Sequence, residues 1–391
     1  MDIAERIQRR RRQDDTLRLV RSYDALSPVS HAAEPSNRGP LLEQLLDHLD
    51  PVFDGTLPPN AYLHGPPGAG KSAVVSALFS SLDELAIDSR STIYTSTRAA
   101  PPLYPRFAYL DMRTATSEFA FYHAVLDGLV EESVPNHGVS TEELRERLHS
   151  LSSTAGSGAL LAVDHVDDPQ APPVSELVDL FASLPSNISW LATGRRPPSE
   201  MELTRYTATT VGVEAYRWQS LVDILMTRGS EGLARQALDH ELARRIADWA
   251  EGNAHDALAV LFGAADGADR DDRTRLGEED VTMAMAEVPH PCVSLGRVLA
   301  LAPNKQLVLY NLADLDPADR ASVTATTEAI SSRPAVDLTP GTVKRFLYEM
   351  AEVGVVERVR SESVDGKGRP PSRVELRFPP TVFQRLYDLQ Q

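Results

Sequence analysis

The feature that most constrains the fold is an octapeptide that fits the phosphate-loop pattern Gly-x-x-x-x-Gly-Lys-Ser/Thr. Its residues are Gly65, Pro66, Pro67, Gly68, Ala69, Gly70, Lys71 and Ser72. The loop joins a short apolar segment at 61–64 to a helical pattern at 73–82. Glycines allow loop amides to point at phosphate oxygens, and the helix N-terminus adds positive potential. The pattern predicts a strand–loop–helix site for ATP or ADP, with Lys71 on the β and γ phosphates and the Ser72 hydroxyl on Mg²⁺.

Two later strand ends carry polar residues that suit the same site. Asp164 follows the apolar segment 159–163 and is the second candidate Mg²⁺ ligand. His165 follows it, where phosphate-loop enzymes usually carry the glutamate that orients the attacking water. A neutral imidazole can accept a proton but lacks a fixed negative charge, so we expect slow or absent ATP hydrolysis. Thr193, at the end of the next apolar segment, either positions water or caps the turn.

The apolar pattern predicts an α/β fold for the first half of the chain. Segments 107–110, 159–163 and 188–192 are short, continuous and bounded by turn residues or helical patterns, as in buried parallel strands. The leucine spacing at 42–52 predicts a helix before the first strand.

Asp167 and Asp168, which lie two and three residues after His165, either replace the missing glutamate or begin the next turn.

The second half of the chain reads as helical and then as a winged helix. Helical periodicity replaces strand patterns after Tyr216, and a charged segment at 266–279 suits a surface loop between two helices. Beyond it, a helical pattern, two further helices and two strands flanking a Gly/Pro-rich tip form the winged-helix pattern. The predicted division is a basic arm at 1–22, an α/β domain at 23–215, a helical domain at 216–290 and a winged-helix domain at 291–391.

The winged-helix segment concentrates positive charge. Residues 296–391 contain 13 Lys and Arg against 12 Asp and Glu, whereas the whole chain has a net charge of −17. We predict that Thr342, Lys344 and Arg345 face the DNA major groove. The hairpin adds three candidate contacts, two of them at its tip for the minor groove. These are Lys367, Arg369 and Arg373. The alternative is a solvated basic hairpin in a protein-interaction domain.

Composition excludes several classes of protein. The single cysteine, Cys292, allows neither an intrachain disulfide nor a cysteine-based zinc site. Apolar segments stay well below the ~18 residues that span a bilayer, so we expect a cytoplasmic protein that does not enter membranes. Only four of the 39 basic residues are lysines. This acidic, lysine-poor balance resembles proteins of halophilic, salt-loaded cytoplasm, or else reflects a coding bias toward arginine.

Taken together, the elements resemble the AAA+ ATPases, and among them the archaeal initiators of the origin-recognition and cell-division-control family. The resemblance rests on several segments in order. They are Tyr109–Arg113, the Gly138-Val139-Ser140 connection, the 221–225 lid opening, the 252–258 Gly-Asn-Ala-His-Asp-Ala-Leu segment and the winged helix. It implies a phosphate-loop sheet with a helical lid and a winged helix. It also implies an ATP-binding replication initiator that binds origin-like repeats in double-stranded DNA and, with other copies, loads a replicative helicase.

The departures from the family pattern concern the reacting positions. His255 stands where the family's lid arginine senses nucleotide, His165 replaces its glutamate and Thr193 its asparagine. The resemblance also assigns Tyr216 to the nucleotide site and Arg205 to contact with a neighbour's nucleotide. A diverged initiator with slow ATP hydrolysis is one hypothesis. The alternatives are a DNA-binding regulator that holds nucleotide as a structural ligand, and a signalling ATPase whose winged helix contacts protein.

Overall fold

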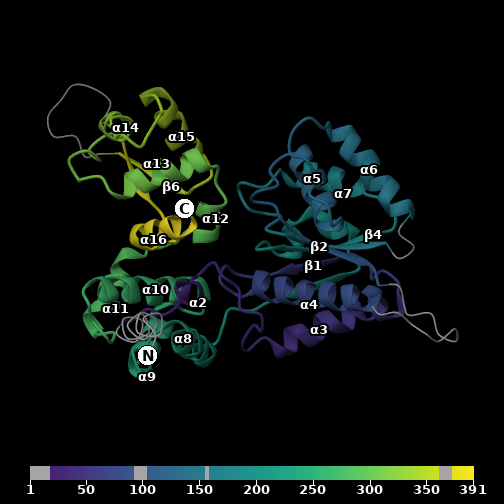
Figure 1. Ribbon diagram of the computed structural model, residues 1–391, viewed down its shortest axis with the longest axis horizontal. Helices are drawn as coiled ribbons and strands as arrows, with labels where there is room; N and C mark the ends of the chain where they lie inside the picture. The colour runs from purple at the N-terminus through teal and green to yellow at the C-terminus, as the bar shows by residue number, and fades with distance from the viewer. Residues whose placement is uncertain (1–17, 92–103, 155–157, 361–371) are drawn as a thin grey trace, which may run out of the picture. The chain divides into compact units, whose positions relative to one another are not determined.

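The computed structural model describes residues 18–91, 104–154, 158–360 and 372–391. The chain forms two compact units. One is His31–Ala215, and the other is Tyr216–Gln391 together with the described residues up to Ser30. The first unit holds a parallel sheet, and the second is helical with a two-stranded hairpin (Figure 1).

The first unit is built on five parallel strands in the order β2-β3-β4-β1-β5. Its elements are α3 (Gly39–Leu49), η1 (Asp50–Asp54), β1 (Ala61–His64), α4 (Lys71–Ser91), β2 (Arg106–Asp111), α5 (Glu118–Leu129), α6 (Thr141–Thr154), β3 (Ala159–Asp164), α7 (Val174–Ala182), β4 (Ile188–Gly194), η2 (Pro198–Glu200), η3 (Glu202–Tyr206) and β5 (Thr209–Gly212). The predicted α/β class and the four predicted strands are confirmed. The edge strand β5 escaped prediction because its four residues include only one large apolar side chain.

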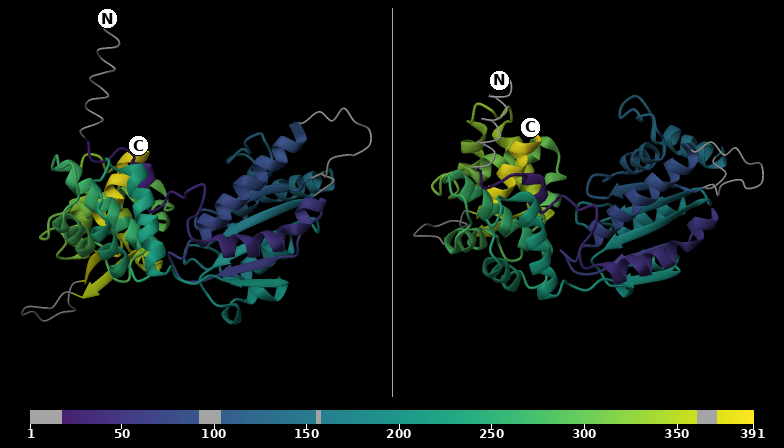
Figure 2. Two further views of the ribbon diagram at one scale, coloured as in Figure 1. Left: turned by 90° about the horizontal axis from the view of Figure 1, so that it is seen from below. Right: turned by 60° about the horizontal axis from the view of Figure 1, so that its bottom comes forward.

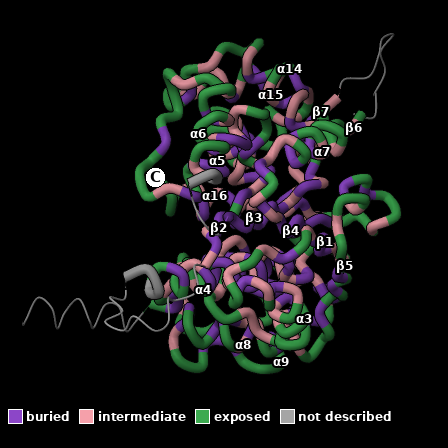
Figure 3. The backbone as a smooth tube through the Cα atoms, turned by 90° about the vertical axis from the view of Figure 1, so that its right-hand side faces the viewer, coloured by how far each residue is buried: buried purple, intermediate pink, exposed green. Residues whose placement is uncertain are grey.

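Helices cover both faces of this sheet. Helices α3 and α4 lie on one face and α5, α6 and α7 on the other (Figures 1 and 2). Successive side chains of a strand point to opposite faces, so Leu160 of β3 packs with α3 and α4, and Leu161 packs with α5, α6 and α7. Strand β3 is buried at every residue, and its neighbour β4 at all but one (Figure 3). This layering brings the carboxyl ends of the strands and the N-terminus of α4 to one edge.

The second unit contains the remaining elements. They are α2 (Tyr23–Leu26), α8 (Trp218–Gly232), α9 (His240–Trp249), α10 (Ala254–Arg270), α11 (Glu278–Glu287), α12 (Leu295–Leu299), α13 (Pro303–Ala313), α14 (Val323–Ser331), α15 (Pro340–Glu352), β6 (Val356–Arg360), β7 (Ser372–Leu376) and α16 (Pro380–Gln390). Helices α13, α14 and α15 followed by the antiparallel β6–β7 pair confirm the predicted winged helix. The final helix α16 was not expected.

The N-terminal segment differs from the predicted division, which ended a basic arm at residue 22 and began the α/β domain at 23. Residues 18–30 belong to the second unit. Val20 forms an antiparallel bridge with Leu233, and Leu26 packs against Gly232. Apolar side chains in this segment bury against α8 and so fix it there. The rest of the predicted arm, residues 1–17, lies outside the described residues.

The predicted surface loop at 266–279 begins five residues too early. Helix α10 continues to Arg270, and Asp266 is only 4% exposed. Its carboxylate accepts a hydrogen bond from the Tyr23 hydroxyl at 2.9 Å and lies 3.2 Å from Arg385 Nε. A buried carboxylate is tolerated because hydroxyl and guanidinium partners surround it.

Candidate nucleotide site and DNA interface

The phosphate loop runs from the end of β1 to the first residue of α4. Gly68 and Gly70 have φ of 67° and 77°, in the left-handed region where a side chain is disfavoured. A Cβ atom at Gly65 would collide with the carbonyl oxygen of Val213. The local backbone therefore requires glycine at these positions, and the loop ends at the positive N-terminus of a 21-residue helix.

Lys71 is folded back over this loop. Its Nζ donates to the carbonyl oxygens of Gly65 and Pro66, each at 2.8 Å, and the residue is only 9% exposed. Burial lowers the pKa of Lys71 to about 8, although the Asp164 carboxylate opposes the shift. A bound phosphate would place negative charge beside this poorly hydrated ammonium and would so favour its charged form.

Asp164 lies at the end of β3 and is 1% exposed. Its carboxylate accepts hydrogen bonds from the Tyr109 hydroxyl, the Thr193 hydroxyl and the backbone N–H of His165. Burial favours the neutral acid, but His165 and hydroxyl donors, Ser72 among them, outweigh it and lower the pKa of Asp164. Asp164 is therefore an ionised carboxylate next to the phosphate loop, and its oxygens can serve as metal ligands.

Thr193 is fixed by this arrangement. It is 1% exposed, and its hydroxyl hydrogen is engaged by Asp164. Its carbonyl oxygen accepts from the backbone N–H of Val166 at 3.0 Å. In this geometry Thr193 holds the carboxylate of the neighbouring strand in place.

His165 faces three oxygen-bearing side chains. Its Nε2 lies 3.5 Å from Ser72 Oγ, and its Nδ1 lies 3.3 Å from Asp111 Oδ1 and 3.4 Å from Asp164 Oδ2. Its backbone has φ of 62°, which is uncommon outside glycine and turns the ring toward this cluster. Ser72 and Asp164 offer the oxygen donors that Mg²⁺ prefers, and the imidazole stands beside both.

Asp111 and Arg113 belong to the same cluster and were not among the predicted site residues. Arg113 makes a two-pronged ion pair with Asp111, at 2.9 Å from Nε and 2.6 Å from NH2. Although burial raises it, the pKa of Asp111 falls well below its ordinary value because His165 and Arg113 donate to the carboxylate. A signal was present, because Asp111 follows an apolar strand just as Asp164 does.

Asp167 and Asp168 are engaged in the turn after β3. Asp167 Oδ2 accepts from the backbone N–H groups of Arg195 and Arg196, at 2.6 and 2.7 Å. Asp168 is buried and accepts from the backbone N–H of Gln170. Both side chains thus support the turn, which was one of the two roles considered for them.

The other predicted nucleotide-site residues lie apart from this cluster in the chain. Arg205, in η3, has a 76% exposed side chain that pairs with Glu202. Tyr216 and His255 belong to the second unit. Tyr216 is buried and its backbone N–H donates to the carbonyl of Gly252, while His255 contacts Asp256 and the start of α12.

Comparison with known proteins agrees with this architecture. Residues 35–191 match the AAA ATPase domain family, and residues 222–286 match the Cdc6 AAA+ ATPase-type lid domain. The chain resembles AAA+ proteins of the ORC/Cdc6 type.

Relatives and solved structures span most of this chain. ORC1-type DNA replication protein 9 of Halobacterium salinarum is 24% identical over 87% of this chain and 90% of its own. ORC1-type DNA replication protein 1 of Aeropyrum pernix is 26% identical over 85% and 86%. The structure of A. pernix Orc1 in complex with DNA superimposes with a TM-score of 0.61, at 23% identity over 94% and 96% of the two chains. Cdc6p from Pyrobaculum aerophilum gives 0.53, at 19% identity over 95% and 99%.

The winged helix presents basic side chains on α15. Lys344 and Arg345 are exposed, and Thr342 contacts the capping Thr339. Lys344 Nζ lies 5.8 Å from the centre of the Tyr348 ring, and the Arg358 guanidinium lies over that ring at 4.4 Å. The Tyr348 ring thus contacts two cations, one from α15 and one from β6. These cations form a positive surface suited to phosphates.

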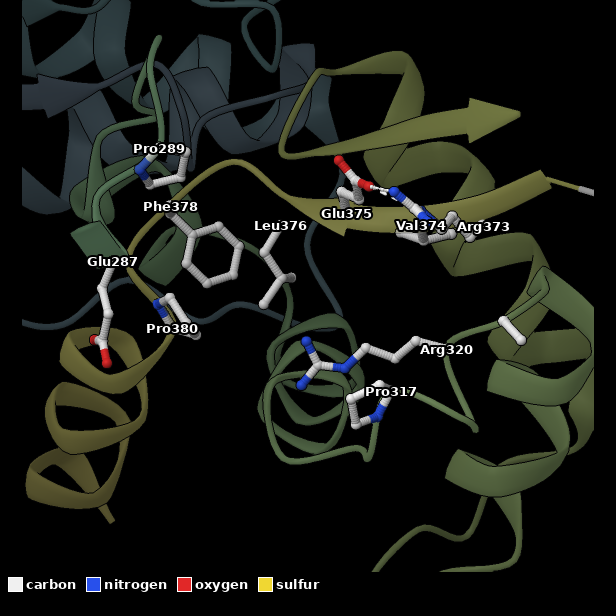
Figure 4. Close-up of a pocket in the computed structure, with 11 residues that line it drawn as sticks. Glu287, Pro289, Pro317, Arg320, Arg373, Val374, Glu375, Leu376, Phe378 and Pro380 are labelled. Atoms are coloured by element: carbon white, nitrogen blue, oxygen red, sulfur yellow. Dashed lines mark hydrogen bonds and ion pairs between the residues drawn. The ribbon is translucent and has the colours of Figure 1, made fainter. Parts of the chain in front are cut away.

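In the described part of the hairpin, Arg373 contributes less free charge than expected. Arg373 of β7 is paired with Glu375 at 2.6 Å, next to a hollow of about 650 Å³ that Arg320 and Phe378 also line (Figure 4). Glu375 therefore offsets the charge of Arg373. The predicted tip contacts Lys367 and Arg369 lie outside the described residues. Within the described part of the chain, none of the helices has the length and apolarity needed to cross a membrane.

Proposed function

We propose that this chain is an ATP-binding replication initiator that recognises origin-like repeats in double-stranded DNA through its winged helix. The observation that carries the proposal is an ionised Asp164 buried beside a complete phosphate loop, in a chain that also has a Cdc6-type lid and a basic winged helix. Names of relatives support it, because they are ORC1-type DNA replication proteins and one solved neighbour is an Orc1–DNA complex.

In this proposal the chain binds ATP or ADP through its own loop. The glycine backbone supplies inward amides, and Lys71 exchanges its two loop carbonyls for phosphate oxygens. Ser72 and Asp164 would hold Mg²⁺, which neutralises phosphate charge when it is bound.

Hydrolysis is slow because the site lacks a free base. His165 stands where the carboxylate is expected, and both of its nitrogens face Ser72, Asp111 and Asp164. The nearby Asp167 is occupied by backbone amides. Asp111 is paired with Arg113, and Asp164 is assigned to Mg²⁺. Water would therefore be activated without a carboxylate that is free to accept its proton.

The winged helix supplies the DNA contact. Lys344 and Arg345 project from α15, the helix that follows α14 in the manner of a recognition helix. The cation pair around Tyr348 adds phosphate contacts, which position the protein but do not specify sequence. Assembly with other copies and loading of a helicase complete the proposed role. In this proposal the exposed Arg205 would contact a neighbouring copy.

A second candidate function is a DNA-binding regulator that holds nucleotide as a structural ligand. The position of His165 favours it, because an imidazole beside Ser72 and Asp164 suits retention of a nucleotide better than its turnover.

The test is a map of DNA bound in vivo by the unaltered protein, by Lys71→Ala and by the double variant Lys344→Ala/Arg345→Ala. Arg235→Ala, which removes an exposed arginine between α8 and α9, is the matched control. An initiator gives peaks at replication start sites that fade in both test variants and persist in the control. Peaks confined to promoters and unchanged by Lys71→Ala support the regulator instead. Signals that are unaffected by the double variant contradict DNA binding through α15.

A further inference from the structure

His255 lies in the first turn of the lid helix α10. Asn253 caps this helix, accepting from the backbone N–H of Asp256 and donating its side-chain Nδ2 to Asp256 Oδ2 at 2.7 Å. These reciprocal bonds fix the Asp256 carboxylate, which is 8% exposed. Its other oxygen, Oδ1, lies 2.9 Å from His255 Nδ1.

The second ring nitrogen of His255 bonds to a residue beyond the lid. His255 Nε2 accepts from the backbone N–H of Leu295 at 2.9 Å. A backbone N–H group only donates and an ionised carboxylate only accepts, so Nε2 is the unprotonated nitrogen and Nδ1 carries the hydrogen. Both nitrogens of the neutral imidazole are then used.

Leu295 begins α12, the first helix after the lid. Its side chain is fully buried, and α12 packs against the final helix α16. Two residues on, Arg297 donates to the carbonyl of Val353, which follows α15. The bond from Leu295 to His255 therefore joins the lid to the frame of the winged helix.

Metal binding does not explain the cluster. Ligand atoms of His255, Asp256 and Cys292 lie within 4.8 Å of one another. However, both imidazole nitrogens are already bonded. Burial, with a further contribution from Asp256, raises the pKa of the Cys292 thiol and keeps it protonated.

We propose that His255 is a positioning residue that fixes the winged-helix domain to the lid, in place of the nucleotide-sensing role that the family resemblance gives to this position. The chemistry of the substitution supports this. Arginine has five N–H donors and no acceptor, so it cannot accept the Leu295 N–H. A histidine that serves Leu295 and Asp256 has no nitrogen left for a phosphate. The lid and the DNA-binding domain accordingly move as one body.

The first experiment follows hydrogen exchange at the Leu295 amide in the full chain. His255→Gln retains an acceptor oxygen near the position of Nε2, whereas His255→Arg and His255→Leu do not. We expect exchange at Leu295 to rise about 10-fold in the Arg and Leu variants and to stay near wild type in His255→Gln. His240→Leu, at an exposed lid histidine, is the control. Equal protection in all variants overturns the proposal.

A second measurement needs no variant to remain folded. With ¹⁵N-labelled histidine, the wild-type protein should show His255 with hydrogen on Nδ1 and a bare Nε2. Finding the hydrogen on Nε2 overturns the proposal, because that tautomer cannot accept from Leu295.

A third measurement, with ATP added, rests on the proposed function. It distinguishes a positioning role of His255 from a nucleotide-sensing role. Saturating ATP should leave Leu295 protection unchanged, since a positioning residue is not drawn to phosphate. Increased exchange at Leu295 on ATP addition supports a sensor and overturns the proposal. Protection of the loop at 65–72 against hydrogen exchange reports ATP binding separately. If that loop shows no protection, nucleotide binding has failed. The comparison of the Gln and Arg variants then still decides the role of His255.

Discussion

Asp111 and Asp164 lie directly opposite each other at the carboxyl ends of the neighbouring parallel strands β2 and β3. A single imidazole, that of His165, faces both carboxylates within 3.4 Å. Both carboxylates have a lowered pKa despite their burial, partly because of this ring. The His165 ring thus lies beside two negatively charged carboxylates. A glutamate at position 165 would lie beside the same two charges.

His165→Glu is expected to raise ATP turnover by at least about 10-fold, because a carboxylate would then orient the attacking water. His165→Gln has a similar length without the charge and should not raise it. Steady-state phosphate release at saturating ATP and Mg²⁺ checks the pair. Equal rates for the Glu and Gln variants would contradict a missing carboxylate as the cause of slow turnover.

Removal of Mg²⁺ should weaken nucleotide binding less in the wild type than in His165→Glu. The imidazole stands beside Ser72 and Asp164, whereas a third carboxylate would increase the demand for a cation. We expect chelation by EDTA to change the Kd of a fluorescent ADP less than about 10-fold in the wild type and by more in the variant. Calorimetry with and without Mg²⁺ measures both. A wild-type loss as large as that of the variant is the contrary result.

The sequence predicts the sheet better than it predicts the site. Continuous apolar segments such as 159–163 identify buried strands, and the glycine pattern of the phosphate loop fixes one strand–helix junction. The edge strand β5 and the burial of Asp266 were missed, since both depend on partners far away in the chain, such as Tyr23. Local sequence patterns do not identify those distant partners.

The chemistry at His165 shows the same limit. Sequence position identifies the residue that replaces a glutamate, but the register of β2 on β3 decides that Asp111 also faces it. Likewise, nothing near residue 255 in the chain indicates that its ring accepts from Leu295, 40 positions away. Side-chain partners brought together by tertiary structure define these roles.

Tyr23 should make stability sensitive to alkaline pH. Burial and the neighbouring Asp266 carboxylate raise the pKa of Tyr23 to about 12, so the folded state retains a proton that the unfolded state loses near pH 10. This stabilisation is present below about pH 10 and is lost as the pH rises toward 12. Between pH 8 and 11, urea denaturation should show the wild type losing about 1 kcal/mol more than Tyr23→Phe, after allowance for partial solvent exposure. Parallel losses in both proteins would contradict the Tyr23–Asp266 contact.

Two glycines of the second unit should respond oppositely to alanine. A Cβ at Gly232, the last residue of α8, would overlap Leu26, whereas a Cβ at Gly267 within α10 meets nothing within 4 Å. Gly267→Ala should raise the free energy of unfolding by about 0.5–1 kcal/mol through helix propensity. Gly232→Ala should lower it by about 1–3 kcal/mol and loosen the N-terminal segment. Denaturant titrations decide the signs, and stabilisation by Gly232→Ala would contradict the packing of Leu26.

Lys344 and Arg373 should contribute differently to DNA binding although both are basic residues of the winged helix. Lys344 is exposed on α15, whereas the guanidinium of Arg373 is held by Glu375 at 2.6 Å. Each neutralised phosphate contributes about −0.9 to the slope of log K against log salt. Lys344→Ala should therefore make the slope shallower by about 0.9, and Arg373→Ala should change it less, because a paired cation releases fewer counterions. Fluorescence anisotropy with a duplex over a series of KCl concentrations measures the slopes, with Arg235→Ala as the control. A Lys344→Ala slope equal to that of the control would place the DNA contact elsewhere than on α15.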